Sequence, residues 1–224
     1  MSKYMDLRMV SKVIIWGGTG QAKVNRPILE NNGMKVLAVF DDTLNLQSPF
    51  SDIDIYCGWD AFIKWISKQG NRSEIGFNVA IGNPHGRVRL KFQERLMAQG
   101  LIPAPVIHPS AIIAENALIG KGVQIMAGAI VQPEANIGDQ CIINTNASID
   151  HENVLEGGVE AGPGATLCGN VHVEVNGWIA VRAVVLPRIR IGHDSIIGAG
   201  SVVTKNVPEN VVVYGSPARI IRSV

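Results

Sequence analysis

The sequence predicts a small α/β domain over residues 1–105, followed by a solenoid of short parallel strands over residues 106–224. Two observations lead to this fold class. The second half places an aliphatic residue at every sixth position, and the first half alternates short apolar runs with helical stretches around a glycine-rich loop. Hydrophobic residues make up 46% of the chain and charged residues 17%, a composition that favours a packed globular protein over a disordered one.

The six-residue repeat keeps its register from Ile107 to Val203 with no residue inserted or deleted. Its positions are Ile107, Ile113, Ile119, Ile125, Val131, Ile137, Ile143, Ile149, Leu155, Ala161, Leu167, Val173, Ile179, Val185, Ile191, Ile197 and Val203. Only Ala161 departs from the larger aliphatic residues, and we expect the strand there to be loosened around a ligand. The residues four positions after each repeat position are small or aliphatic, with Asn153 as the exception.

A period of six residues fits short strands joined by turns, because neither a helix nor a long alternating strand has that period. Three such units close one triangular coil, so residues 18 apart stack about 4.8 Å above one another in parallel strands. The aliphatic repeat positions then point into the coil. Glycines follow several of these positions, where we expect turns with positive φ. These glycines are Gly120, Gly138, Gly162, Gly192 and Gly198.

The first half predicts a βαβ arrangement. Apolar runs at residues 13–16, 35–40 and 77–81 predict strands, and residues 21–31, 59–68 and 87–99 predict helices. We expect Pro27 to kink or shorten the first helix, because proline lacks a backbone N–H donor. The glycine-rich residues 17–20 lie between the first strand and helix, where backbone N–H groups can bind a phosphate. Lys23 occupies the place of the third glycine of a dinucleotide fingerprint, which argues against an NAD site.

These motifs resemble known families. Residues 106–219 open with Val-Ile-His-Pro and close with Tyr-Gly-Ser-Pro-Ala-Arg, and they resemble the left-handed β-helix of hexapeptide-repeat acyltransferases. Residues 17–24 (Gly-Gly-Thr-Gly-Gln-Ala-Lys-Val), 39–42 and 80–83 resemble the sialic-acid O-acetyltransferases and the bacillosamine-type nucleotide-sugar N-acetyltransferases. The resemblance implies a Rossmann-like nucleotide-sugar-binding domain joined to a left-handed β-helix. It also implies acetyl-CoA as the co-substrate, and a homotrimer with sites between subunits.

Carried over to this chain, the resemblance places the nucleotide-sugar substrate in the first domain. Gln21 stands where the family commonly has histidine, which is a departure from the family's pattern at this contact. Asp41 and Asp42 follow the second strand, and the resemblance implies that one or the other meets the base or ribose; the alternative is a solvated turn. The implied substrate-binding residues are Gly17, Gly18, Gln21, Asp41, Asp42 and Asn83.

The catalytic residues implied by the resemblance lie in one coil. His151 is the candidate general base, Glu152 orients or polarises its imidazole, and Asn144 adds a hydrogen bond. An imidazole can accept a proton at neutral pH. Gly169 lies 18 residues after His151, so the register itself stacks a glycine against the histidine and leaves room for the thioester. Glu160 stands where family members often have a second histidine.

CoA carries several phosphates, so we expect basic residues of the C-terminal coils to contact it. The candidates for the acetyl-CoA site are Gly169, Arg182, Arg188, Lys205 and Ala199, and further basic residues in this region are Arg190, Arg219 and Arg222. Neither Cys141 nor Cys168 has the setting of a nucleophile, which predicts direct attack of the acceptor on the thioester.

Composition and spacing exclude several other functions. The formal net charge is +1, which gives no electrostatic basis for binding nucleic acid. No apolar run is long enough to span a membrane, and the opening residues lack the apolar core of a signal peptide. Three cysteines without ligand spacing fit a reducing cytoplasm. His151, His172 and His193 are 21 residues apart rather than 18, so we expect no metal site.

These features predict a cytoplasmic, acetyl-CoA-dependent N-acetyltransferase that acts on a nucleotide-linked 4-amino-4,6-dideoxy sugar. UDP-linked acceptors are preferred, with GDP- and dTDP-linked ones close behind, and the products would enter lipopolysaccharide or other glycans. Two alternatives stay open at this point. One is O-acetylation of sialic acid or another sugar by the same residues, and the other is a non-catalytic trimer that binds nucleotide sugars.

Overall fold

The computed structural model describes residues 10–224, so the opening residues considered for a signal peptide lie outside the described part. By their contacts, the residues form two compact units. The first unit runs up to Gly82 and includes Lys91–Val106, and the second comprises Asn83–Leu90 and Ile107–Val224. Asn83, a predicted substrate contact of the first domain, therefore belongs with the solenoid.

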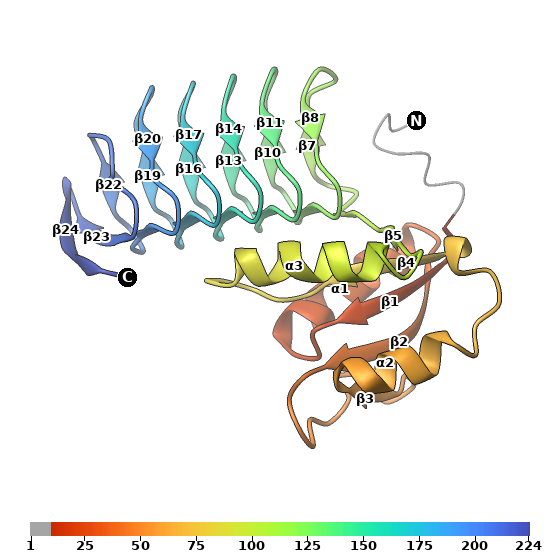
Figure 1. The fold of residues 1–224 in the computed structure, drawn as a ribbon. Helices are drawn as coiled ribbons and strands as arrows, with labels where there is room; N and C mark the ends of the chain where they lie inside the picture. The colour runs from red at the N-terminus through yellow and green to blue at the C-terminus, as the bar shows by residue number, and fades with distance from the viewer. Residues whose placement is uncertain (1–9) are drawn as a thin grey trace. The chain divides into compact units, whose positions relative to one another are not determined.

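The first unit is built on a parallel five-stranded sheet in the order β3-β2-β1-β4-β5 (Figure 1). An aromatic cluster fills its core, where the Trp16 ring lies 4.5 Å from Phe92 and 5.7 Å from both Phe40 and Phe62, centre to centre. The strands are β1 (Lys12–Trp16), β2 (Lys35–Asp41), β3 (Ile55–Cys57), β4 (Ile75–Val79) and β5 (Ile102–Pro103). The short strands β3 and β5 were not predicted from the sequence.

Residues 10–224 also form three α-helices and one short 3-10 helix, all between Gly20 and Met97. They are α1 (Gly20–Asn31), α2 (Gly58–Ile66), η2 (Arg72–Glu74) and α3 (Gly86–Met97). The expected shortening of the first helix at Pro27 is wrong, because α1 continues through it for 12 residues. Ile28 and Leu29, directly after the proline, are buried in the unit and hold the helix by packing despite the missing N–H donor.

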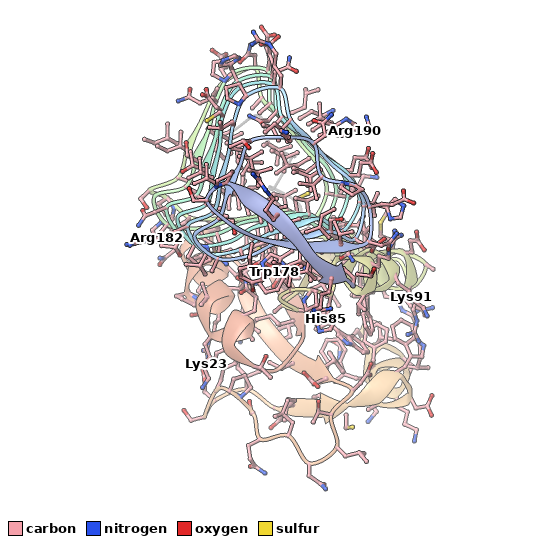
Figure 2. The ribbon with its side chains drawn as sticks, turned by 90° about the vertical axis from the view of Figure 1, so that its left-hand side faces the viewer. Lys23, His85, Lys91, Trp178, Arg182 and Arg190 are labelled. Atoms are coloured by element: carbon pink, nitrogen blue, oxygen red, sulfur yellow. The ribbon has the colours of Figure 1, made fainter. Side chains whose placement is uncertain are left out.

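The second unit is a parallel β-helix with three faces, each a sheet of stacked strands (Figures 1 and 2). The six-stranded face contains β7 (Ile112–Ile113), β10 (Ile130–Val131), β13 (Ser148–Ile149), β16 (Thr166–Leu167), β19 (Val184–Val185) and β22 (Val202–Val203). The five-stranded face contains β8 (Leu118–Ile119), β11 (Asn136–Ile137), β14 (Val154–Leu155), β17 (His172–Val173) and β20 (Arg190–Ile191). The eight-stranded face contains β6 (Val106–Ile107), β9 (Gln124–Ile125), β12 (Ile142–Ile143), β15 (Glu160–Ala161), β18 (Trp178–Ile179), β21 (Ile196–Ile197), β23 (Val211–Gly215) and β24 (Ala218–Ser223).

Turns join the faces along three edges, which we name by number. Edge 1 joins the six- to the five-stranded face and consists of turns 132–135, 150–153, 168–171 and 186–189, continuing to residue 205. Edge 2 joins the five- to the eight-stranded face through turns 138–141, 156–159, 174–177 and 192–195. Edge 3 joins the eight- to the six-stranded face through turns 126–129, 144–147, 162–165, 180–183 and 198–201.

The predicted register is confirmed. Residues 18 apart pair in parallel, as in the series Val131, Ile149 and Leu167, and the repeat positions from Ile125 onward are buried. The expectation of a loosened strand at Ala161 is wrong. Ala161 is fully buried and pairs regularly with Ile143 on one side and Ile179 on the other, so the smaller side chain leaves the strand pairing unchanged.

The glycines that follow repeat positions serve a different purpose from the one expected. Positive φ occurs two residues later, as at Gly128, Gly164 and Glu152. The reason for glycine directly after the repeat position is close packing between coils. A Cβ on Gly120 would lie 2.6 Å from the backbone carbon of Gly138 on the next coil, closer than any side chain tolerates.

Among residues 10–224, no helix is both long and apolar enough to cross a membrane.

Candidate active site

His151 and Glu152 form a close pair at the tip of an edge 1 turn. The imidazole Nδ1 lies 2.9 Å from Glu152 Oε2, and both side chains are about half exposed. The backbone N–H of His151 donates to Asp150 Oδ1 at 2.7 Å, which fixes the start of the turn. When Nδ1 carries the proton and donates it to the carboxylate, Nε2 is left with a free lone pair that can accept a proton.

Gly169 lies directly against this imidazole. A Cβ built on Gly169 would be 2.4 Å from His151 Nε2 and 2.5 Å from Cε1, so any larger residue would displace the ring. The two turns are hydrogen-bonded to each other, since the Asn170 N–H donates to the His151 carbonyl at 2.9 Å. The structure therefore brings His151, Glu152 and Gly169 together, as the 18-residue spacing predicted.

Asn144 lies elsewhere. It begins the edge 3 turn after β12, whereas His151 lies on edge 1, across the six-stranded face. Its Nδ2 donates to Glu160 Oε1 at 3.4 Å, and its Oδ1 accepts the Thr145 N–H at 2.8 Å. The prediction that Asn144 joins His151 is therefore wrong within one chain, because the two residues sit at opposite borders of a face.

Glu160, the residue in place of a second histidine, is buried on the eight-stranded face. Burial raises the pKa of its carboxyl group, and the nearby Arg89 acts in the opposite direction. Its Oε2 atom is buried with no hydrogen-bond partner among the described residues, as are Nδ2 and Oδ1 of Asn83 in the same unit.

Arg89 was not identified from the sequence. Its side chain is fully buried, with Nε donating to the Gln140 carbonyl at 2.9 Å and Nη2 to the Gly158 carbonyl at 2.7 Å. These carbonyls belong to neighbouring edge 2 turns, 18 residues apart. Arg89 therefore fastens the segment Asn83–Leu90 to the coils of its own unit, and no sequence pattern distinguishes it from a surface arginine of a helix.

The predicted CoA-binding residues fall into two groups. Gly169, Arg188 and Lys205 lie on edge 1, and Arg188 donates its backbone N–H to the Gly169 carbonyl at 3.1 Å. Both basic side chains are exposed, and Lys205 lies three coils beyond His151 in the same stack, a rise of about 14 Å at the strand spacing. Arg182 and Ala199 are also exposed but belong to edge 3.

The remaining basic candidates lie away from these edges. Arg190 is on the five-stranded face, where its Nε donates to Glu174 at 2.6 Å and the guanidinium also contacts His172 (Figure 2). Arg219 and Arg222 are exposed on β24, the terminal strand of the eight-stranded face. Arg190 already has a carboxylate partner, so it is a weaker candidate for a phosphate contact.

In the first unit, the glycine loop is tightly built. Gly17 has φ of 106°, and a Cβ there would lie 2.4 Å from the Ala80 carbonyl oxygen, so only glycine fits. Asp41 accepts the Gly18 N–H at 2.7 Å and the Thr43 N–H at 2.8 Å. The Asp41 carboxylate therefore braces the loop, and its contact with a base or ribose stays a prediction.

Two other predicted contacts of this pocket have clear positions. Asp42 is exposed and follows the end of β2, and Gln21 lies in the first turn of α1. Gln21 Nε2 donates to Asn25 Oδ1 at 3.3 Å, and Asn25 donates to the buried Asn78 at 2.8 Å. Gln21 thus begins a chain of amides that runs from the helix start into the sheet.

The cysteines are poorly suited to carry an acyl group. Cys141 is fully buried, which raises the pKa of its thiol to about 12, and its Sγ donates to the Glu156 carbonyl at 3.0 Å. Burial also raises the pKa of Cys168. A thiol must ionise to become a nucleophile, so neither residue favours a covalent acyl-enzyme.

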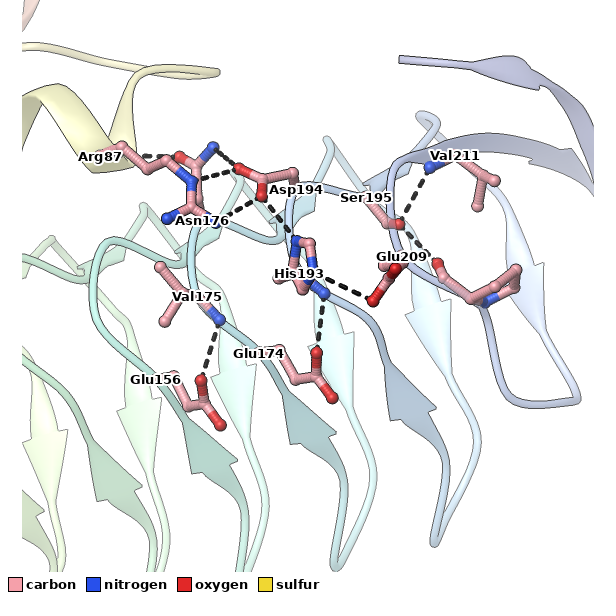
Figure 3. A network of polar contacts seen from close by, with 11 residues as sticks. Arg87, Glu156, Glu174, Val175, Asn176, His193, Asp194, Ser195, Glu209 and Val211 are labelled. Atoms are coloured by element: carbon pink, nitrogen blue, oxygen red, sulfur yellow. Dashed lines mark hydrogen bonds and ion pairs between the residues drawn. The ribbon is translucent and has the colours of Figure 1, made fainter.

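The three regularly spaced histidines lie apart. His151 is on edge 1, His172 on β17 with Glu156 as its partner, and His193 on edge 2. Figure 3 shows the His193 ring between Asp194 and Glu209, and Arg87 binding the same Asp194 carboxylate. Within residues 10–224, no three His, Cys, Asp or Glu side chains form a group that could hold a metal ion.

Comparisons with known proteins identify relatives of both units. Residues 12–96 match the PglD N-terminal domain family. PerB from Caulobacter crescentus, solved with CoA and GDP-perosamine, is 34% identical with a TM-score of 0.82, covering 94% of this chain and 97% of that one. The acetyltransferase domain of PglB from Neisseria gonorrhoeae, solved with acetyl coenzyme A, is 26% identical with a TM-score of 0.83, covering 95% and 100%.

Curated relatives align over shorter segments. A GDP-perosamine N-acetyltransferase of Escherichia coli O157:H7 is 32% identical over 149 residues, which is 64% of this chain and 66% of the relative. The galactoside O-acetyltransferase of Lactococcus lactis is 46% identical over 61 residues, only 30% of its length. The likeness that spans both units is therefore to acetyltransferases, one of them solved with CoA and GDP-perosamine. The chain belongs to the PglD-type family of hexapeptide-repeat, left-handed β-helix nucleotide-sugar N-acetyltransferases.

Proposed function

We propose that the chain transfers the acetyl group of acetyl-CoA to the ring amine of a nucleotide-linked 4-amino-4,6-dideoxy sugar, with His151 as the general base. The observation that carries this proposal is the His151–Glu152 pair facing Gly169. It combines a proton acceptor, a carboxylate that stabilises the imidazolium, and a glycine whose missing side chain lets the ring lie against the next coil.

The reaction can proceed in a single transfer. The amine nitrogen attacks the thioester carbonyl carbon, the new C–N bond forms, and His151 Nε2 takes the proton that the amine loses. The C–S bond then breaks, and the imidazolium returns the proton to the departing CoA thiolate. The backbone N–H of Gly169 is suited to donate to the oxyanion that develops on the carbonyl oxygen. The raised pKa values of Cys141 and Cys168 support this direct route.

The CoA arm would run along edge 1. Arg188 and Lys205 follow His151 and Gly169 on successive coils toward the C-terminus, so a cationic path leads away from the base. Lys205 lies about 14 Å from the His151 level at the strand spacing, a distance that suits an extended arm between thioester and phosphates. These two side chains are exposed and therefore free to bind phosphate.

We further propose that the active unit is a homotrimer. Asn144, Arg182 and Ala199 lie on edge 3, whereas His151 and Arg188 lie on edge 1. The six-stranded face separates the two groups within a chain. If edge 1 of one subunit lay beside edge 3 of the next, each site would receive residues from two subunits, and three copies would close the ring.

The remaining question is which nucleotide the sugar substrate carries. Gly17, Gly18 and the exposed Asp42 form the candidate nucleotide pocket in the first unit, with Gln21 close by. We propose GDP in place of the UDP expected from the sequence. The support is that the relatives named for GDP-perosamine are 32–34% identical, against 26% for PglB. Because acetyl-CoA and nucleotide sugars are cytoplasmic metabolites, we place the enzyme in the cytoplasm.

The test is CoA release, followed with a thiol reagent, from acetyl-CoA and a panel of GDP-, UDP- and dTDP-linked 4-amino sugars. We expect the GDP-linked acceptor to turn over fastest, and His151→Ala to lower kcat by about 10²-fold or more. Turnover of hydroxyl acceptors alone would move the assignment to O-acetylation. If calorimetry detects no binding of acetyl-CoA, the assignment would change to a non-catalytic protein that binds nucleotide sugars.

Subunit complementation tests the shared site. His151→Ala and Arg182→Ala subunits, each weak alone, would be refolded together. If sites lie between subunits, some sites in the mixed trimers contain neither substitution, and CoA release rises above the sum of the two parents. A mixture that stays at that sum, or a monomer by light scattering, would contradict the proposal.

A further inference from the structure

A buried amide connects the two turns that carry His151 and Gly169. Asn153 has 0% of its surface exposed. Its Nδ2 donates to the carbonyl of Asp150 at 2.7 Å and to the carbonyl of Cys168 at 3.0 Å, and its Oδ1 accepts the Val171 N–H at 3.2 Å. Asp150 and Cys168 are the residues immediately before His151 and Gly169. A single side chain therefore binds both turns of the site.

Several other turns of the solenoid close through a backbone hydrogen bond alone. On the preceding coil of edge 1, the Ala135 N–H donates to the Gln132 carbonyl at 3.4 Å, and on edge 3 the Ala165 N–H donates to the Gly162 carbonyl at 3.0 Å. The equivalent carbonyls at the site belong to Asp150 and Cys168, and these accept from the Asn153 side chain. The local geometry of these two turns thus depends on Asn153.

Packing alone gives no reason for an amide at this position. The residues that share its interior stack, at intervals of 18, are aliphatic: Ala117, Ala135, Val171, Ile189 and Val207. Burying an amide among them is unfavourable unless its hydrogen bonds are made, whereas alanine or valine would fit without that cost. The polar residue occurs in the coil that carries His151, which points to a role in the site.

We propose that Asn153 is a positioning residue that sets the spacing and tilt of the His151 and Gly169 turns, and thereby the place of the imidazole. This inference rests on the proposed function, in which His151 accepts the proton of the acceptor. The space between the imidazole and Gly169 is small, because a single methyl group on Gly169 would already lie 2.4 Å from His151 Nε2. Asn153 touches neither the imidazole nor the outer surface, so it acts only through the turns.

The test compares Asn153→Val with a packing control. Valine matches the aliphatic stack and removes all three hydrogen bonds. Val159→Ala, at the next interior position of the same coil, opens a cavity at edge 2 without touching the two turns. We expect Asn153→Val to lower kcat by about 10²-fold with little change in the KM for acetyl-CoA, since a displacement near 1 Å has that effect. Val159→Ala should keep kcat within about twofold while lowering the melting temperature.

A cycle with His151→Ala separates positioning from general damage. If Asn153 acts through the imidazole, adding Asn153→Val to His151→Ala should cost less than about twofold in kcat. An equal fold-loss in both backgrounds would overturn the inference. Asn153→Ala, which copies Ala135 of the preceding coil, serves as the second variant if valine prevents folding.

One measurement is independent of turnover. The ¹⁵N spectrum of the imidazole reports which ring nitrogen of His151 carries the proton. We expect the Nδ1-protonated form in the wild type, held by Glu152, and a mixture of both forms in Asn153→Val. Unchanged ring signals in the variant would overturn the inference. A wild type with the expected ring signals but no turnover of any acceptor would instead count against the proposed function alone.

Discussion

Gly169→Ala tests the geometry of the site most directly. The new Cβ would lie 2.4 Å from His151 Nε2 and 2.5 Å from Cε1, about 1 Å closer than ordinary van der Waals contact. The backbone of Gly169 does not have positive φ, so alanine is conformationally acceptable there and the fold should be kept. The ring must therefore move by roughly 1 Å, which would weaken its 2.9 Å contact with Glu152.

A displacement of that size costs about 10²-fold in rate. This equals about 2.7 kcal/mol of transition-state stabilisation, so kcat for CoA release should fall by that factor. The melting temperature should change by only a few degrees, because the imidazole is half exposed and can rotate into solvent. Stopped or continuous thiol assays at saturating acetyl-CoA would measure the change.

The matched control is Gly157→Ala, at the same point of its hexapeptide on edge 2. Its Cβ would meet the flexible end of Leu90 at 3.1 Å, which can give way, and kcat should stay within about twofold. If Gly169→Ala also kept kcat within that range while His151→Ala abolished turnover, the stacking of ring on glycine would be irrelevant to catalysis. The reasoning about this site would then be refuted.

Three further outcomes are expected. Glu152→Gln keeps a hydrogen bond to His151 Nδ1 but removes the charge that stabilises the imidazolium, so kcat for CoA release should fall by about tenfold. Cys141→Ala should leave kcat unchanged, since its thiol, with a pKa near 12, takes no part in direct transfer; a lost activity in a folded variant would support an acyl-enzyme. Asp194 has a pKa held below its ordinary value by Arg87, so it stabilises the fold above about pH 4, and this contribution is lost as the pH falls. Urea unfolding should therefore show Asp194→Asn destabilised at pH 7, with a gap from wild type that shrinks toward pH 3.

The sequence was sufficient to predict the solenoid because each coil repeats the same six-residue pattern of aliphatic positions and turns. Aliphatic residues at every sixth position are buried together when three short strands close one coil. The strand partner of each residue then lies 18 positions away in the sequence. The pairing of His151 with Gly169 follows from the same count and is confirmed by the contact between them. Asn153 was also visible in the sequence, as the polar exception in its stack. Its role could be inferred only from the hydrogen bonds in the structure.

Other features could not be predicted in this way because they depend on contacts that do not follow from the six-residue repeat. Arg89 lies on a segment outside the repeat and is buried against the coils, and its partners are backbone carbonyls that any sequence provides. Asp41 was interpreted as a substrate contact, since the strand end alone does not reveal that the Gly18 and Thr43 N–H groups already bind it. Asn144 was grouped with His151 through the family resemblance, whereas the coil places the two residues on different edges of one chain.

The unbroken 18-residue coil gives the protein a built-in unit of length. Residues that stack on His151 along edge 1, such as Gly169 and Lys205, are separated from it by a whole number of coils, so the separation between the base and Lys205 is a multiple of about 4.8 Å and takes no intermediate value. Removing or adding one coil between them would shorten or lengthen the reach by one such step while leaving every inward residue in register. Acceptance of longer or shorter acyl carriers could thus change in discrete increments, by the gain or loss of coils rather than by substitution.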